Sequence, residues 1–120
     1  MYKVSFYKDK SGRQPAVEYL RELTARRDKD ARIRARKIQE YINILQEHGT
    51  YIGEPICKHL EGNIWELRPA RDRVLFVAWH NNGYVILHAF EKKTQKTPER
   101  EKEKARREYI DLQERGMEDE

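Results

Sequence analysis

Hydrophobic residues in the first half of the chain change from the period of a strand to the period of a helix. Residues 2–7 alternate between apolar and polar positions, which predicts a strand. After a Ser-Gly break, Pro15 suits the first position of a helix, and apolar residues then recur at helical spacing as far as Leu23. A charged turn at residues 26–28 leads to a longer predicted helix, which Gly49 would end. Its apolar stripe comprises Ala31, Ala35, Ile38, Ile42 and Leu45.

Alternation returns in the second half of the chain. Residues 64–68 predict a strand with Trp65 and Leu67 on its inward face and Glu66 and Arg68 on the opposite face. Residues 73–80 are almost continuously apolar, as expected of a central strand covered on both sides. The Asn-Asn-Gly turn at residues 81–83 joins that strand to residues 84–90 as a hairpin. Beyond Pro98 a last helix is predicted, with Ala105, Tyr109 and Leu112 on its apolar stripe.

The order of these elements predicts an α+β protein. It reads β-α-α-β-β-β-α, with a mainly antiparallel twisted sheet packed against an N-terminal helical hairpin and a C-terminal helix. A chain of 120 residues is too short for a second core, so residues 1–120 are expected to form a single domain.

Charge narrows the choice of partner only slightly. The chain holds 25 Lys and Arg against 21 Asp and Glu, which gives a net charge of +4 and favours an anionic partner without naming one. A single cysteine, Cys57, excludes an intramolecular disulfide and a cysteine-based metal site. The four histidines show no spacing typical of metal ligands, so no metal or cofactor is expected. The opening residues resemble no signal peptide and no apolar run reaches membrane-spanning length, which favours a cytoplasmic protein without a membrane partner.

Two segments concentrate basic residues. Residues 21–37 and residues 92–107 each hold eight basic and three acidic side chains. The first segment fits the solvated face of two helices. The second begins where a strand ends, at Phe90, so its lysines are presented from a backbone that the sheet fixes at one end. A binding role and a plain strand-to-helix connection both remain open for it.

Arg68 and Arg73 flank a short connection between two predicted strands. If that connection is a hairpin, the two guanidiniums lie close together at one end of the sheet, and an anion between them would relieve their repulsion. Arginine suits this task because its planar fork meets a phosphate with two hydrogen bonds. The alternative is a set of weak surface ion pairs, of Arg68 with Glu66 or Glu91 and of Arg73 with Asp72.

Nucleophilic catalysis has no obvious candidate residue. Ser5 and Ser11 are the only serines, and neither lies in a nucleophile elbow; no glycine-rich phosphate loop is present either. His80 and His88 alternate with apolar residues and are expected in the core or on a sheet face. His59, beside a lysine in a predicted loop, is the better candidate for acid–base chemistry.

Three blocks of the sequence resemble the signature of the phage-related HigB-type toxins, which belong to the RelE/ParE superfamily. The blocks are residues 58–68 (KHLEGNIWELR), 73–76 (RVLF) and 88–98 (HAFEKKTQKTP). Their order and spacing match the family, and the helical hairpin before them agrees, so the resemblance covers nearly the whole chain.

The resemblance implies an mRNA endonuclease that cleaves messages in the ribosomal decoding site. It also implies a HigA-like helix-turn-helix antitoxin as partner, through which the complex contacts operator DNA. Mapped by motif, the catalytic candidates are Arg68 and Arg73 as phosphate clamps, Lys93, and His59. The candidate RNA contacts are Lys58, Phe90, Lys92, Thr94 and Lys96, with Phe90 as a stacking surface. Several members carry a tyrosine or histidine in the C-terminal segment, where this chain has lysines and Thr94, so the general base stays open.

The implied chemistry is attack of a ribose 2′-hydroxyl on the adjacent phosphorus. It requires a base, positive charge on the phosphorane oxygens and an acid for the leaving oxygen, and it needs no metal. Two other classes remain: a non-enzymatic inhibitor of DNA gyrase, as in the ParE branch, and a nucleic-acid-binding regulator.

Overall fold

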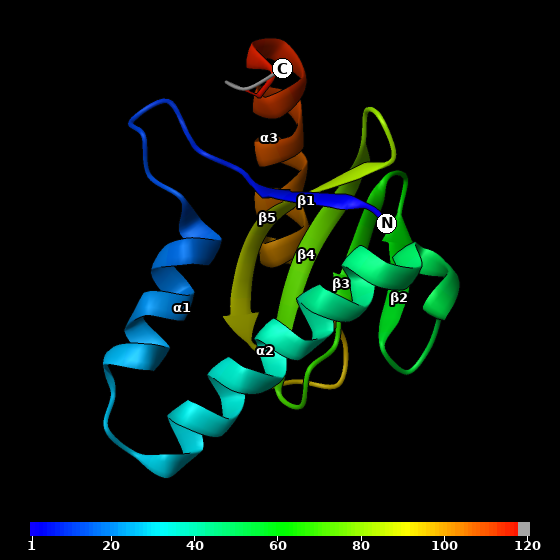
Figure 1. Cartoon of the computed structure of the whole chain (residues 1–120). Helices are drawn as coiled ribbons and strands as arrows, with labels where there is room; N and C mark the ends of the chain where they lie inside the picture. The colour runs from blue at the N-terminus through cyan, green and yellow to red at the C-terminus, as the bar shows by residue number, and fades with distance from the viewer. Residues whose placement is uncertain (118–120) are drawn as a thin grey trace.

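The computed structural model describes residues 1–117 and shows five strands, three α-helices and a short 3-10 helix (Figure 1). In chain order these are β1 (Lys3–Phe6), α1 (Pro15–Ala25), α2 (Lys29–His48), the 3-10 helix η1 (Gly49–Ile52), β2 (Cys57–Glu61), β3 (Ile64–Leu67), β4 (Asp72–Trp79), β5 (Gly83–Glu91) and α3 (Glu99–Arg115). No helix in residues 1–117 combines the length and the apolar character needed to cross a membrane.

The strands form one sheet in the order β1-β5-β4-β3-β2. Only β1 runs parallel to its neighbour, β5, and the other three pairs are antiparallel. The predicted α+β class with a mainly antiparallel sheet is therefore confirmed. β4 occupies the centre of the sheet, and its first six residues are buried, as the continuous apolar run predicted.

Local signals in the sequence set the bounds of the helical hairpin. Pro15 occupies the first turn of α1, where its missing N–H costs no hydrogen bond. The carboxylate of Asp28 caps α2 by accepting a hydrogen bond from the backbone N–H of Ala31 at 2.8 Å. Gly49 ends α2 with φ of +63°, a conformation that favours glycine.

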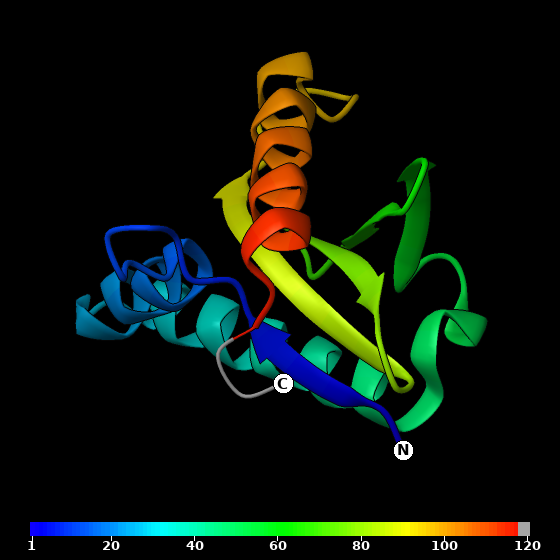
Figure 2. The same ribbon diagram turned by 90° about the horizontal axis from the view of Figure 1, so that it is seen from above.

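The helices cover opposite faces of the sheet (Figure 2). The apolar stripes of α1 and α2 pack on the face that carries Leu67, Val74 and Phe76. The stripe of α3 packs through Ala105 and Leu112 on the other face. Residues on the sheet consequently fall into two groups, an α1/α2 face and an α3 face, which alternate along each strand except at bulges in β2 and β5.

β2 is the one strand that the sequence analysis assigned to a loop. Its residues, CKHLE, alternate too weakly in polarity to indicate a strand, and it pairs with β3 alone, at the edge of the sheet. The predicted alternation of β3 holds, since Trp65 and Leu67 lie on the α1/α2 face. The opposite face of β3 is also covered, however, and Glu66 is only 2% exposed.

Candidate functional site

Cationic side chains converge on an open hollow at one end of the sheet. Arg68 and Arg73 follow and precede the paired residues Leu67 and Val74, at the β3–β4 turn, and both lie on the α3 face. The hollow has a volume of about 690 Å³. We call it the basic hollow; it is lined by Arg68, Ala70, Arg71, Arg73, Lys92, Lys93, Thr94 and Gln95. The hairpin geometry expected for the two arginines is thus observed.

Arg73 lacks a carboxylate partner in the part of the chain that the structure describes. Its Nη1 donates hydrogen bonds to the carbonyl oxygens of Ala70, at 2.9 Å, and Asp72, at 2.7 Å, while its Nε is buried without a partner. The residue is only 8% exposed. Burial lowers the pKa of Arg73, and the nearby charge of Arg68 lowers it further. A buried guanidinium with an unsatisfied Nε and no counter-charge is costly, and a phosphate in the hollow would supply the missing negative charge.

The expected alternative, an ion pair of Arg73 with Asp72, is wrong. Successive residues of a strand point to opposite faces, so the Asp72 carboxylate lies on the α1/α2 face. There it accepts hydrogen bonds from Arg34 of α2, at 2.7 and 3.0 Å, and from the hydroxyl of Tyr19 of α1. Asp72 is fully buried, so Arg34 and Tyr19 hold its charge away from the basic hollow.

Arg68 is loosely paired. Its Nε lies 3.7 Å from a carboxylate oxygen of Glu66 and makes no hydrogen bond, and its Nη1 lies 3.4 Å from Glu54. Pairing with Glu66 was one expected alternative; pairing with Glu91 was the other and is not found. Glu91 instead lies 3.0 Å from the guanidinium of Arg71.

The segment after β5 supplies the lysines. Its start is fixed by a hydrogen bond of 2.7 Å from the backbone N–H of Lys92 to the carbonyl of Arg71. Lys93, Thr94 and Lys96 are exposed, and the Thr94 hydroxyl donates to the carbonyl of Lys96 at 2.7 Å. Burial lowers the pKa of Lys92, and the charges of Arg73 and Arg68 lower it further. Within residues 1–117, Lys92, Lys93 and Lys96 have no ion-pair partner.

Lys58 and His59, adjacent in sequence, are separated by the sheet. Lys58 pairs in register with Glu66 on the α3 face and is close enough to influence the pKa of Lys92. His59 pairs with Trp65 on the α1/α2 face, where the two rings lie 5.0 Å apart and His59 Nε2 is 2.7 Å from the carbonyl of Gly62. The structure therefore places His59 outside the basic hollow.

Phe90 lies beneath the hollow rather than on its surface. It pairs in register with Arg73, belongs to the core under α3 and is 9% exposed. Little of its ring is available for stacking on a base.

His88, two residues before Phe90, is 1% exposed, in agreement with the expected core position. Its Nδ1 lies 2.6 Å from Glu108, and its Nε2 lies 3.0 Å from Glu101. His80, by contrast, is exposed at the β4–β5 turn.

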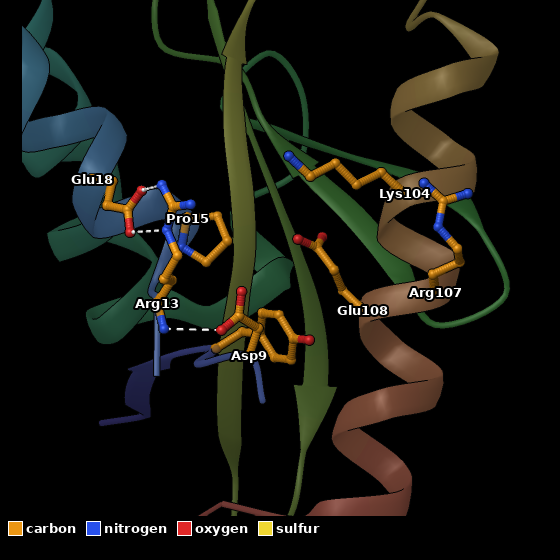
Figure 3. Close-up of a pocket in the computed structure, with 8 residues that line it drawn as sticks. Asp9, Arg13, Pro15, Glu18, Lys104, Arg107 and Glu108 are labelled. Carbon is orange, nitrogen blue, oxygen red and sulfur yellow. Dashed lines mark hydrogen bonds and ion pairs between the residues drawn. The ribbon is translucent and has the colours of Figure 1, made fainter. Parts of the chain in front are cut away.

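A second hollow, of about 450 Å³, lies between α3 and the segment that leads into α1 (Figure 3). Its lining carries three cations and three carboxylates: Arg13, Lys104, Arg107, Asp9, Glu18 and Glu108. The guanidinium of Arg13 pairs with Glu18 at 2.8 Å, so the charges offset one another. The basic hollow is the better anion site.

Residues 1–117 contain no group of three or more His, Cys, Asp or Glu side chains placed to hold a metal ion.

Sequence reasoning missed several residues of this region. Arg71 and Gln95 line the basic hollow but were not singled out, although both lie within segments already considered. Glu66 was noted only as a possible partner of Arg68. Its carboxylate accepts a hydrogen bond from Thr97, in the segment before α3, and the strand pattern gives no signal of this contact.

Comparison with known proteins agrees with this architecture. A search of curated proteins finds no match to this chain. Among solved structures, the chain is similar to a chain of the archaeal RelE–RelB complex from Pyrococcus horikoshii, with 21% sequence identity and a TM-score of 0.53. The match covers 76% of this chain and 94% of that one, and at this identity it shows a shared fold. The sequence model of the Gp49-like phage-derived proteins (DUF891) matches residues 18–110, and the chain belongs to this family.

Proposed function

We propose that this protein is the toxin of a toxin–antitoxin system and acts as a ribosome-dependent mRNA endonuclease of the HigB kind. The observation that carries the proposal is the guanidinium of Arg73, nine-tenths buried, without a carboxylate partner and facing a hollow lined by further cations. RNA is a chain of phosphates at regular spacing, and arginine recognises phosphate with two parallel hydrogen bonds.

In the proposed reaction a ribose 2′-oxygen attacks the adjacent phosphorus. A base takes the proton of the 2′-hydroxyl, the bond from phosphorus to the 5′-oxygen breaks, and an acid protonates the leaving oxygen, which leaves a 2′,3′-cyclic phosphate and a 5′-hydroxyl. Arg68 and Arg73 bind the non-bridging oxygens, and Lys93 stabilises the charge that develops on them. Loss of one preorganised charge of this type costs about 2.7–4 kcal/mol. Lys92, whose pKa is lowered, is better suited to proton transfer than an ordinary lysine.

The remaining RNA contacts are assigned to the same face. Lys58, Lys92, Thr94 and Lys96 border the path of the backbone. His59 and Phe90, both chosen from the sequence, receive less support, because one faces the other side of the sheet and the other is buried in the core. In a site with these residues the catalysis would rest on arginine and lysine.

The partners follow from the proposed function. The similar archaeal structure is a RelE–RelB complex, and we propose an antitoxin for this chain too, of the HigA-like helix-turn-helix class. Operator DNA would then be bound through the complex, and the toxin would act in the cytoplasm on mRNA held by the ribosome.

Cleavage of a translated message tests the proposal. Purified protein is added to ribosomes programmed with a short mRNA, and cleavage sites are mapped by primer extension. The expected result is cleavage in the decoding site, abolished by a single 2′-deoxy substitution at the cleaved nucleotide. Binding of the message without cleavage would indicate a regulator. Early induction of DNA-damage signalling in cells, before translation stops, would indicate a gyrase inhibitor.

A further inference from the structure

We infer that Glu66 is a positioning residue of the basic hollow. Its carboxylate contacts both segments that line the hollow: the β3–β4 turn, which carries Arg68, and residues 92–97, which carry the lysines. The inference rests on the proposed nuclease function and adds a residue to which that function, as stated above, gives no role.

The two carboxylate oxygens of Glu66 contact different segments. One carboxylate oxygen accepts a hydrogen bond of 2.6 Å from the hydroxyl of Thr97, at the end of the segment that carries the lysines. The other lies 3.7 Å from Nε of Arg68, at the β3–β4 turn. One side chain of β3 thus contacts a residue from each of the two segments that line the basic hollow.

The bond to Thr97 fixes the far end of the lysine segment. The near end is held by the backbone bond between Lys92 and Arg71, and between these two points Lys93 and Lys96 are exposed. An exposed segment fastened at both ends has fewer conformations than one fastened at one end. The Thr97–Glu66 bond therefore limits where the lysines lie relative to Arg68.

The negative charge of Glu66 also acts on Arg73 and Lys92, although the Glu66 side chain does not line the hollow. Glu66 raises the pKa of Arg73 and of Lys92, against the burial and mutual repulsion that lower them. Its side chain is 3% exposed and does not line the basic hollow. A carboxylate in this position reduces repulsion among the cations and still leaves their outward N–H groups for a phosphate.

Two substitutions separate these effects. Glu66→Gln keeps an oxygen that accepts from Thr97 and removes the negative charge. Thr97→Val removes the hydroxyl and keeps the shape, and Thr97→Ser restores the hydroxyl. Matched controls are Glu103→Gln, on the exposed face of α3, and Thr24→Val, whose hydroxyl bonds only within α1 at 3.1 Å.

Each variant is tested for single-turnover cleavage on programmed ribosomes, RNA affinity and melting temperature. We expect Thr97→Val to cleave about tenfold to hundredfold more slowly because the lysines are misplaced, and Thr97→Ser to recover most of this rate. Glu66→Gln should cleave more slowly yet bind RNA at least as tightly as the unchanged protein, since a repelling charge is gone. A merely structural residue would lower affinity and rate together, in step with the melting temperature. Variants that remain folded and cleave at the unchanged rate would overturn the inference.

A readout without RNA distinguishes this inference from the nuclease proposal. NMR titration of the Lys92 ammonium in Glu66→Gln should show its midpoint at lower pH than in the unchanged protein, and amide exchange of residues 93–97 should quicken in Thr97→Val. If the unchanged protein cuts no RNA, the nuclease proposal fails while these two measurements still test Glu66. If neither measurement moves, the positioning role is wrong whatever the activity.

Discussion

The guanidinium of Arg34 and the carboxylate of Asp72 form a buried ion pair, joined by hydrogen bonds of 2.7 and 3.0 Å. This pair links α2 to the first residue of β4, and Tyr19 extends it to α1. The ion pair also affects Arg73, on the α3 face of the sheet. Because Asp72 is committed to Arg34, it forms no ion pair with the adjacent Arg73, whose guanidinium remains available to an anion.

Removal of Arg34 should destabilise the fold more than removal of a neighbouring arginine. Arg34→Met leaves Asp72 charged and buried with the Tyr19 hydroxyl as its remaining partner, and loss of one member of such a pair costs about 3–5 kcal/mol. Urea unfolding measures the change, and Arg34→Met combined with Asp72→Asn should recover part of it. Arg32→Met, on the exposed side of α2, should change stability by less than about 0.5 kcal/mol. Equal effects of the two single substitutions would contradict a structural role for the pair.

Much of the fold could be predicted because apolar periodicity reports which face is buried. The central strand β4 and the β4–β5 hairpin follow directly from an apolar run and an Asn-Asn-Gly turn. β2 could not be found in this way, since an edge strand buries little and need not alternate. That one omission changed the site, because only a strand places Lys58 and His59 on opposite faces of the sheet.

The convergence of Arg68 and Arg73 was predictable because a short hairpin forces its flanking residues together. Their partners were not, because these come from elements distant in sequence. Arg34 reaches Asp72 across 38 residues, and Thr97 reaches Glu66 across 31. A pattern along one strand carries no information about which helix will cover it.

His88 should be as sensitive as Arg34, for a different reason. Its two ring nitrogens contact Glu108 and Glu101, so both can donate only when the imidazole is charged. His88→Leu would leave the buried carboxylate of Glu108 without its imidazole partner, whereas Glu101 keeps a contact of 3.8 Å with Arg100, and we expect a loss of about 3–5 kcal/mol. Thermal unfolding checks this, with His48→Leu, at the exposed end of α2, as the control. An unchanged melting temperature for His88→Leu would show that the contacts contribute nothing to the docking of α3.

Acid should weaken the attachment of α3 through Asp111. A hydrogen bond from Arg115, and another from Tyr7, lower the pKa of Asp111 to about 2. A carboxyl whose pKa is lower in the folded state contributes stability above its unfolded pKa, and this contribution disappears as pH falls toward the folded value. Between about pH 4 and pH 2, the free energy of unfolding should therefore fall less steeply in Asp111→Asn than in the unchanged protein. Glu114→Gln, on the exposed face of α3, should retain the unchanged slope in urea titrations.

The exposed lysines should contribute to RNA affinity through charge alone. Lys93→Gln and Lys96→Gln are each expected to weaken binding of single-stranded RNA and to reduce the dependence of log K on log salt by about one unit or less. The control is Lys104→Gln, which lines the second hollow and should leave both quantities unchanged. Fluorescence anisotropy at three salt concentrations gives the slopes. Equal losses in all three variants would move the RNA-binding surface away from the basic hollow.

Arg73 offers the sharpest test, because its contributions to stability and to activity are expected to have opposite signs. The folded protein bears the cost of a buried guanidinium with an unpartnered Nε, and Arg73→Met replaces it with an apolar chain of similar length. Removal of this desolvation cost should at least offset the loss of the two hydrogen bonds that Nη1 donates, so we expect the stability to be unchanged or raised. Cleavage, in contrast, should fall about a hundred- to a thousandfold, since a preorganised charge on the phosphate is lost. Melting temperature and single-turnover rate measured on the same sample decide the matter. A variant that melts well below the unchanged protein would show that Arg73 is held in place for the fold, and the phosphate would then need another ligand.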